Sequence, residues 1–182
     1  MKTIQFRIIG LFLLQFFVIN QLLAQQEFDV RKVRWGFSPK QVRDADTLKP
    51  TSVKKEKITY TRVPLADRKV GLEYEFNGDS LLSANYYYYV LPGITEADVK
   101  QTAVDLAALI TDKYGKGKTA QVGELQTVTW LTPRTQIRLA LGNTDRGWSL
   151  EITYLCRVCS GDPKDAEQAK KPWKPLKEVQ DL

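Results

Sequence analysis

Two cysteines near the end of the last apolar segment are the most reactive side chains of the sequence. Cys156 and Cys159 form the motif C-R-V-C, and the 182 residues contain no other cysteine. In an extended strand their Cα atoms would lie about 10 Å apart, at roughly 3.3 Å per residue, whereas a disulfide needs less than about 7 Å. A bridge therefore needs a turn at 157–158, and the run S-G-D-P at 160–163 indicates that the strand ends there. An oxidising compartment favours a structural disulfide, with two unpaired thiols and a redox or metal-binding pair as alternatives.

Other catalytic chemistry finds little support in the residue types. The chain has no histidine, which excludes a Ser-His-Asp triad, a Cys-His pair and a histidine-based zinc site. A thioredoxin-type pair lies at a helix N-terminus, whereas Pro163 follows this pair at the exit of a strand. No nucleophile-elbow, phosphate-loop or dinucleotide-binding motif is present. We therefore expect no enzymatic activity, no cofactor and no metal site.

Four consecutive tyrosines, Tyr86 to Tyr89, are the most unusual local feature. Side chains alternate across a strand, so Tyr87 and Tyr89 share one face while Tyr86 and Tyr88 share the other. If the even positions face the core, Tyr87 and Tyr89 form an outward amphipathic surface of the kind enriched at binding interfaces. The alternatives are that tyrosine simply suits β structure, or that the C-terminal tail covers this surface. The strand phases would place on the same face Glu73, Glu75, Thr127, Thr129, Arg138, Glu151 and Thr153, of which Arg138 is a further binding candidate.

Positive charge is concentrated near the N-terminus. The formal net charge is +6, and residues 25–72 contain 12 basic and 6 acidic side chains. Arg31, Lys32 and Arg34 lie close together and could form a patch for an anionic partner. The alternative is a solvated basic face. No nucleic-acid-binding motif is present, so we expect no nucleic-acid partner.

The first 24 residues have the layout of an export signal. Lys2 and Arg7 precede the apolar run 8–19, and Ala24 offers a small residue for cleavage. The run is shorter than the roughly 20 residues that span a bilayer, although an uncleaved anchor is the rival interpretation. We expect a signal peptide at 1–24, a single domain at 25–159 and a polar tail at 160–182. The protein would be periplasmic or secreted, with no integral membrane segment after cleavage. Its partner would be another envelope protein or an anionic envelope component.

Two helices have clear start signals. Ser38 can cap a short helix over 39–45, with Pro39 in the first position and Gln41 completing a capping box. Thr95 can cap a second helix, which carries apolar residues at helical spacing and ends at Gly115.

Alternating strands follow each helix, and Asn77-Gly78 predicts a hairpin turn. The alternation predicts one apolar and one polar face, as in a sheet that is covered on one side. We expect an α+β fold in which two helix-plus-antiparallel-strand halves form one curved antiparallel sheet with both helices on one face. The expected strands are 58–63, 70–76, 81–91, 127–132, 135–141 and 148–156.

The segment 33–42, V-R-W-G-F-S-P-K-Q-V, resembles the W-G-x-S-x-x-x-V opening of small exported bacterial proteins of unknown function. The helix-plus-sheet order also resembles that of beta-lactamase-inhibitor-protein-like domains, and this resemblance implies protein binding rather than catalysis. We therefore expect a non-enzymatic interaction protein that uses either Tyr87 and Tyr89 or the basic N-terminal patch. The alternatives are a thiol-redox protein that uses Cys156 and Cys159, and a purely structural envelope component.

Overall fold

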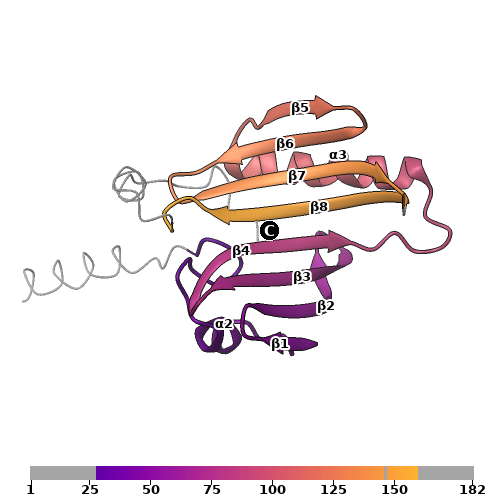
Figure 1. Ribbon diagram of the computed structural model, residues 1–182. Helices are drawn as coiled ribbons and strands as arrows, with labels where there is room; N and C mark the ends of the chain where they lie inside the picture. Colours follow the sequence, from indigo (N-terminus) through magenta and orange to yellow (C-terminus); the bar gives the residue numbers. More distant parts are fainter. Residues whose placement is uncertain (1–27, 146, 160–182) are drawn as a thin grey trace, which may run out of the picture.

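A computed structural model describes residues 28–145 and 147–159, so the expected signal peptide and tail lie outside the described residues. The described chain forms one eight-stranded antiparallel sheet with two helices (Figure 1). This confirms the prediction of a sheet-rich α+β protein. The helices are α2 (Pro39–Ala45) and α3 (Glu96–Tyr114), and the strands are β1 (Ser52–Lys54), β2 (Lys57–Leu65), β3 (Arg68–Asn77), β4 (Ser80–Tyr88), β5 (Lys118–Val122), β6 (Leu125–Leu131), β7 (Thr135–Thr144) and β8 (Gly147–Cys156).

The order of strands across the sheet is β1-β2-β3-β4-β8-β7-β6-β5. Helix α2 precedes β1 to β4, helix α3 precedes β5 to β8, and the two groups of strands meet where β4 pairs with β8 (Figure 1). Each helix is followed by four strands rather than the expected three. Strands β1 and β5 were not predicted, because both are short edge strands without a buried residue and neither has an alternation of apolar side chains.

Both helices begin as the capping signals predicted. The Ser38 side chain accepts a hydrogen bond from the Gln41 backbone N–H, and the Gln41 side chain accepts one from the Ser38 backbone N–H. Thr95 and Asp98 form the same reciprocal pair at the start of α3, which ends at Gly115 with φ 85°. Such boxes satisfy backbone N–H groups that have no partner inside the helix. Among the residues that the structure describes, no helix combines the length and the apolar composition needed to cross a bilayer.

The hydrophobic core lies on the face of the sheet that carries the even-numbered residues of β3 and β8. Helix α3 reaches this face at β6, where Trp130 Nε1 donates to Thr111 Oγ1 at 3.3 Å. The residue after α2 reaches it at β3, where the Tyr74 hydroxyl donates to Asp46 Oδ2 at 3.3 Å. Four tyrosines are fully buried on this face, namely Tyr60, Tyr74, Tyr86 and Tyr154.

A β-bulge in β4 corrects the expected core face of that strand. Phe76 pairs with Leu81, but Glu75 pairs with Ser83, so Leu82 is the extra residue. Leu81 is therefore buried in the core and Leu82 is half-exposed, the reverse of the expectation. Strand β4 also ends at Tyr88 instead of residue 91, which leaves Val90 exposed.

Candidate functional site

One row of side chains crosses the face of the sheet opposite the core, here called the outward face. Strand pairing aligns Glu73 of β3 with Asn85 of β4, and Asn85 in turn with Thr153 of β8. The same row continues through β7 and β6. Every residue in it is polar, and across the sheet from β2 to β6 the row consists of Thr59, Glu73, Asn85, Thr153, Arg138 and Thr129.

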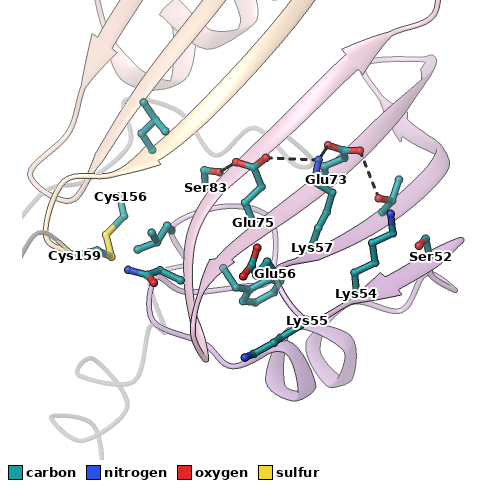
Figure 2. Close-up of a pocket in the computed structure, with 15 residues that line it drawn as sticks. Ser52, Lys54, Lys55, Glu56, Lys57, Glu73, Glu75, Ser83, Cys156 and Cys159 are labelled. Carbon is teal, nitrogen blue, oxygen red and sulfur yellow. Dashed lines mark hydrogen bonds and ion pairs between the residues drawn. A yellow bond between two sulfur atoms is a disulfide. The ribbon is translucent and has the colours of Figure 1, made fainter.

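Ionic contacts connect β2, β3 and β4 on the outward face (Figure 2). Lys57 Nζ lies 2.7 Å from Glu73 Oε2 and 3.7 Å from Glu75 Oε1. The Ser83 hydroxyl donates to Glu75 Oε2 at 2.7 Å. The hydrogen bond to Glu73 is the main reason that the pKa of Lys57 is raised. The two carboxylates are therefore held in fixed positions, but they remain partly open to solvent.

A groove with a volume of about 1260 Å³ lies over this network. Figure 2 shows the disulfide at one end of the groove and the lysines of the β1–β2 turn at the other. Leu82, which the bulge turns outward, and Leu155 add apolar surface to the lining. The lining therefore changes along the groove, from apolar near the disulfide, through the carboxylates of Glu73 and Glu75, to cationic at the β1–β2 turn. The charged residues that line it are Lys54, Lys55, Glu56, Lys57, Glu73 and Glu75.

Tyr87 is half-buried on the outward face, as the sequence predicted. Its hydroxyl donates to Glu73 Oε2 at 3.3 Å, so it joins the network around Lys57. Burial raises the pKa of Tyr87 well above its usual value, and the nearby carboxylates of Glu73 and Glu151 raise it further. Tyr87 therefore stays protonated at neutral pH and keeps its hydroxyl as a hydrogen-bond donor.

Tyr89 lies just beyond the end of β4 and reaches back over β3. A Cβ atom placed on Gly71 would lie 2.5 Å from the Tyr89 hydroxyl oxygen and 3.7 Å from the Tyr87 Cβ atom. The missing side chain of Gly71 therefore makes room for the Tyr89 ring beside Tyr87. Tyr89 is 39% exposed, so an aromatic surface remains open to solvent at this position.

The cysteine pair forms a disulfide, as favoured from the sequence. The Cα atoms of Cys156 and Cys159 lie 5.7 Å apart, since the chain turns at the end of β8 as required. The Cys159 sulfur lies 3.9 Å from the Leu81 carbonyl oxygen. The bridge therefore anchors the end of β8 beside the start of β4, at the border of the groove.

Arg31, one residue of the expected basic patch, is not a surface cation. Arg31 points inward, where its Nε atom lies 3.4 Å from Asp46 Oδ2, and the two side chains are only 13% and 2% exposed. Lys32 and Arg34 belong to the same segment, in which Val33 is buried in the core. The structure thus separates Arg31 from any surface patch, whereas Arg138 lies in the outward polar row.

Sequence reasoning did not identify Gly71, Ser83 or Leu155 as parts of this site. Gly71 pairs with Tyr87, and the alternation of β3 was sufficient to place it outward. Ser83 faces Glu75 only because of the bulge at Leu82, which no feature of the sequence predicts. Leu155 looks like an isolated outward apolar residue until the pairing of β4 with β8 brings it beside Ser83.

Comparisons of the chain with protein-family models, with curated proteins and with solved structures find no match. Within residues 28–145 and 147–159, no group of three or more histidine, cysteine, aspartate or glutamate side chains has a geometry that could hold a metal ion. The geometry of the outward face is therefore the basis for assigning a function.

Proposed function

We propose that this protein is an exported, non-enzymatic binding protein whose outward face recognises an extended polypeptide segment. In this proposal the two halves form one curved sheet, and both helices cover the core face. Two contacts support that layout, because Thr111 of α3 meets Trp130 and Asp46 after α2 meets Tyr74, both of them core-facing side chains. The disulfide is compatible with an oxidising compartment.

The observation that carries the proposal is the continuity between the groove and the tyrosines. Glu73 is shared, since it lines the groove and accepts the hydrogen bond from Tyr87. Along one path a partner would meet apolar surface at Leu155, fixed carboxylates at Glu73 and Glu75, and then aromatic surface. Alternating apolar and charged side chains of an extended peptide match such a lining. Aromatic anchors with a surrounding polar rim are also what binding surfaces use.

The test compares two pairs of outward side chains in the full chain. Tyr87→Ala/Tyr89→Ala removes the aromatic surface, and Leu125→Ala/Leu131→Ala is the matched control on β6, where both leucines are exposed. Each protein is immobilised, incubated with cell-envelope extract and crosslinked through Lys57 before mass spectrometry.

We expect proteins that crosslink to Lys57 with the wild type to be at least tenfold depleted with the tyrosine variant and retained by the control. Equal recovery by all three proteins contradicts the proposal. Recovery of partners whose crosslinks all map to the segment 28–37 would also contradict it, because that result assigns binding to the basic N-terminal residues.

A further inference from the structure

We propose that the groove recognises a partner segment in the polyproline II conformation, in which every third side chain contacts the groove. From the disulfide to the β1–β2 turn these side chains are apolar, cationic and anionic. This inference rests on the proposed function and deepens it, because it states which side chains the extended segment presents to the outward face. Three features of the groove support it: the row of residues along it, the charges left open in that row, and the spacing of the row.

A single row of paired residues runs along the groove from β8 to β1. Leu155 of β8 pairs with Ser83 of β4, and Ser83 pairs with Glu75 of β3. Glu75 pairs in turn with Lys57 of β2, and Lys57 pairs with Lys54 of β1. All five residues line the groove, and the disulfide lies beside the apolar end (Figure 2). The groove therefore presents an apolar side chain, a hydroxyl, a carboxylate and two ammonium groups in a fixed order.

Glu75 is the carboxylate of the groove that can accept a cation from a ligand. The side chain of Glu73 is only 21% exposed and already accepts hydrogen bonds from Lys57 and Tyr87. The side chain of Glu75 is 45% exposed, and its Oε2 atom accepts from Ser83. Its Oε1 atom lies 3.7 Å from Lys57 Nζ, which is too long for a hydrogen bond. A cationic side chain can therefore approach Glu75 Oε1 from the solvent.

The β1–β2 turn supplies the opposite charge at the far end of the groove. Lys54 and Lys55 are exposed, and neither forms an ion pair with a carboxylate of the described residues. Together with Glu56 they leave the turn with a net positive charge. An anionic side chain of the ligand pairs with this turn, whereas exchanging the two ligand charges would bring like charges together at both positions.

The spacing of the row matches a repeat of three residues. Leu155 and Glu75 are two strands apart, as are Glu75 and Lys54, which gives about 9.6 Å for each step at roughly 4.8 Å per strand. A polyproline II helix has three residues per turn and rises about 3.1 Å per residue, so its side chains repeat every 9.3 Å or so. In a β-strand the side chains on one side repeat after only about 6.6 Å.

The backbone of the groove also favours this conformation. The five strands under the groove are already paired with one another, so the face offers side chains and no backbone partners. A polyproline II segment has no internal hydrogen bonds and keeps its backbone hydrated, so it needs no pairing partner. Tyr87 lies four residues along β4 from Ser83, about 13 Å away, and contacts another part of the same partner.

The experiment is fluorescence anisotropy of the full chain with labelled synthetic peptides. The probe is L-P-P-R-P-P-E, with both ends blocked so that only side chains carry charge. Since the face contacts side chains alone, the opposite chain direction, E-P-P-R-P-P-L, is measured too, and the tighter binder is used. One comparison peptide exchanges the arginine and the glutamate, and another, L-P-R-P-E, shortens the repeat to two residues. We expect the probe to bind at least about tenfold more tightly than either comparison peptide.

Two variants assign the charges of the probe to positions in the groove. We expect Glu75→Gln to weaken the probe by about three- to fivefold, but not a peptide with glutamine in place of the arginine. We expect Lys54→Gln to weaken the probe by a similar factor, but not a peptide with glutamine in place of the glutamate. Unchanged binding of these neutral peptides shows that each variant is folded. The matched controls are Glu124→Gln and Lys118→Gln, which alter exposed residues outside the groove and should bind every peptide as the wild type does.

The inference is overturned if the probe shows no binding up to about 1 mM. It is also overturned if the exchanged or the shortened peptide binds as tightly as the probe, or if neither variant discriminates between charged and neutral peptides. The envelope pull-down separates this inference from the proposed function. If the probe fails but partners still depend on Tyr87 and Tyr89, only the inference fails. If the probe binds as expected but no envelope partner depends on the tyrosines, the proposed function fails.

Discussion

Two adjacent residues, Tyr86 and Tyr87, show how differently the two faces of the sheet use the same side chain. Tyr86 points into the core, where its ring packs edge-on against Tyr154 with the centroids 5.9 Å apart. Tyr87 points outward and donates to the carboxylate of Glu73. Burial is the main reason that the pKa of each tyrosine is raised, but the charged neighbours act in opposite directions. Arg31 opposes the rise at Tyr86, whereas Glu73 and Glu151 add to it at Tyr87.

The surroundings of the two tyrosines differ in a way that fits a structural role for Tyr86 and the recognition role that we propose for Tyr87. On the core face the tyrosines contact one another, as in the edge-on pair of Tyr60 and Tyr74 at 5.8 Å, and supply buried area. On the outward face Tyr87 donates a hydrogen bond to a carboxylate of the charged network, and Tyr89 leaves aromatic surface exposed to solvent. A change on the core face should therefore lower stability, and a change on the outward face should lower binding.

The largest expected effect is the loss of the fold at alkaline pH. Burial raises the pKa of Tyr60 and of Tyr114 to about 12, and it raises that of Tyr74 and Tyr154 well above the usual value. Above pH 10 the unfolded chain loses tyrosine protons that the folded chain keeps, so the free energy of unfolding falls as pH rises. Below pH 10 both states keep these protons and the tyrosines cause no change.

We expect tyrosinate absorbance and loss of circular dichroism to rise together in one cooperative transition above pH 11. Ionisation of all eight tyrosines near pH 10 with the dichroism intact would show that burial does not protect the core-facing hydroxyls.

The next largest effect is the difference in stability between variants of the adjacent residues Tyr86 and Tyr87. Tyr86→Ala removes a fully buried ring, and we expect it to lower the free energy of unfolding by about 3–5 kcal/mol. Tyr87→Ala removes a half-buried ring and one hydrogen bond, and we expect a loss of about 1 kcal/mol. Urea denaturation of both variants measures the difference. Similar losses would mean that the outward face is part of the core.

The fold was largely predictable where local chemistry decides the structure. Ser38 and Thr95 start their helices because their side chains satisfy backbone donors at once. Strand β8 alternates without interruption, so its core side chains, such as Ile152 and Tyr154, were assigned correctly. Tyr87 was assigned to the outward face for the same reason.

The candidate site was less predictable, because it depends on register between distant strands. The bulge at Leu82 shifts β4 by one residue against β3, and this shift brings Ser83 beside Glu75. The pairing of β4 with β8 joins residues about 70 positions apart and adds Leu155. Arg31 looked like a surface cation, and only the folded chain places Asp46 beside it. None of these contacts has a local signal in the sequence.

The smallest effect on stability gives the sharpest test of the outward face. Gly71→Ala would place a methyl group 2.5 Å from the Tyr89 hydroxyl oxygen and 3.1 Å from its ring carbon Cζ. These two atoms are at the far end of the partly exposed Tyr89 side chain, so the ring can move away from the methyl group. We therefore expect the free energy of unfolding to change by less than about 1 kcal/mol. The displaced ring should nevertheless reduce recovery of any partner that crosslinks to Lys57. Gly142→Ala is the matched control in the other half of the sheet, because its methyl group would lie 3.3 Å from the flexible Leu125 Cδ1 and 4.0 Å from the next nearest atoms. Unchanged recovery with Gly71→Ala, together with shifted Tyr89 resonances, would show that Tyr89 takes no part in binding.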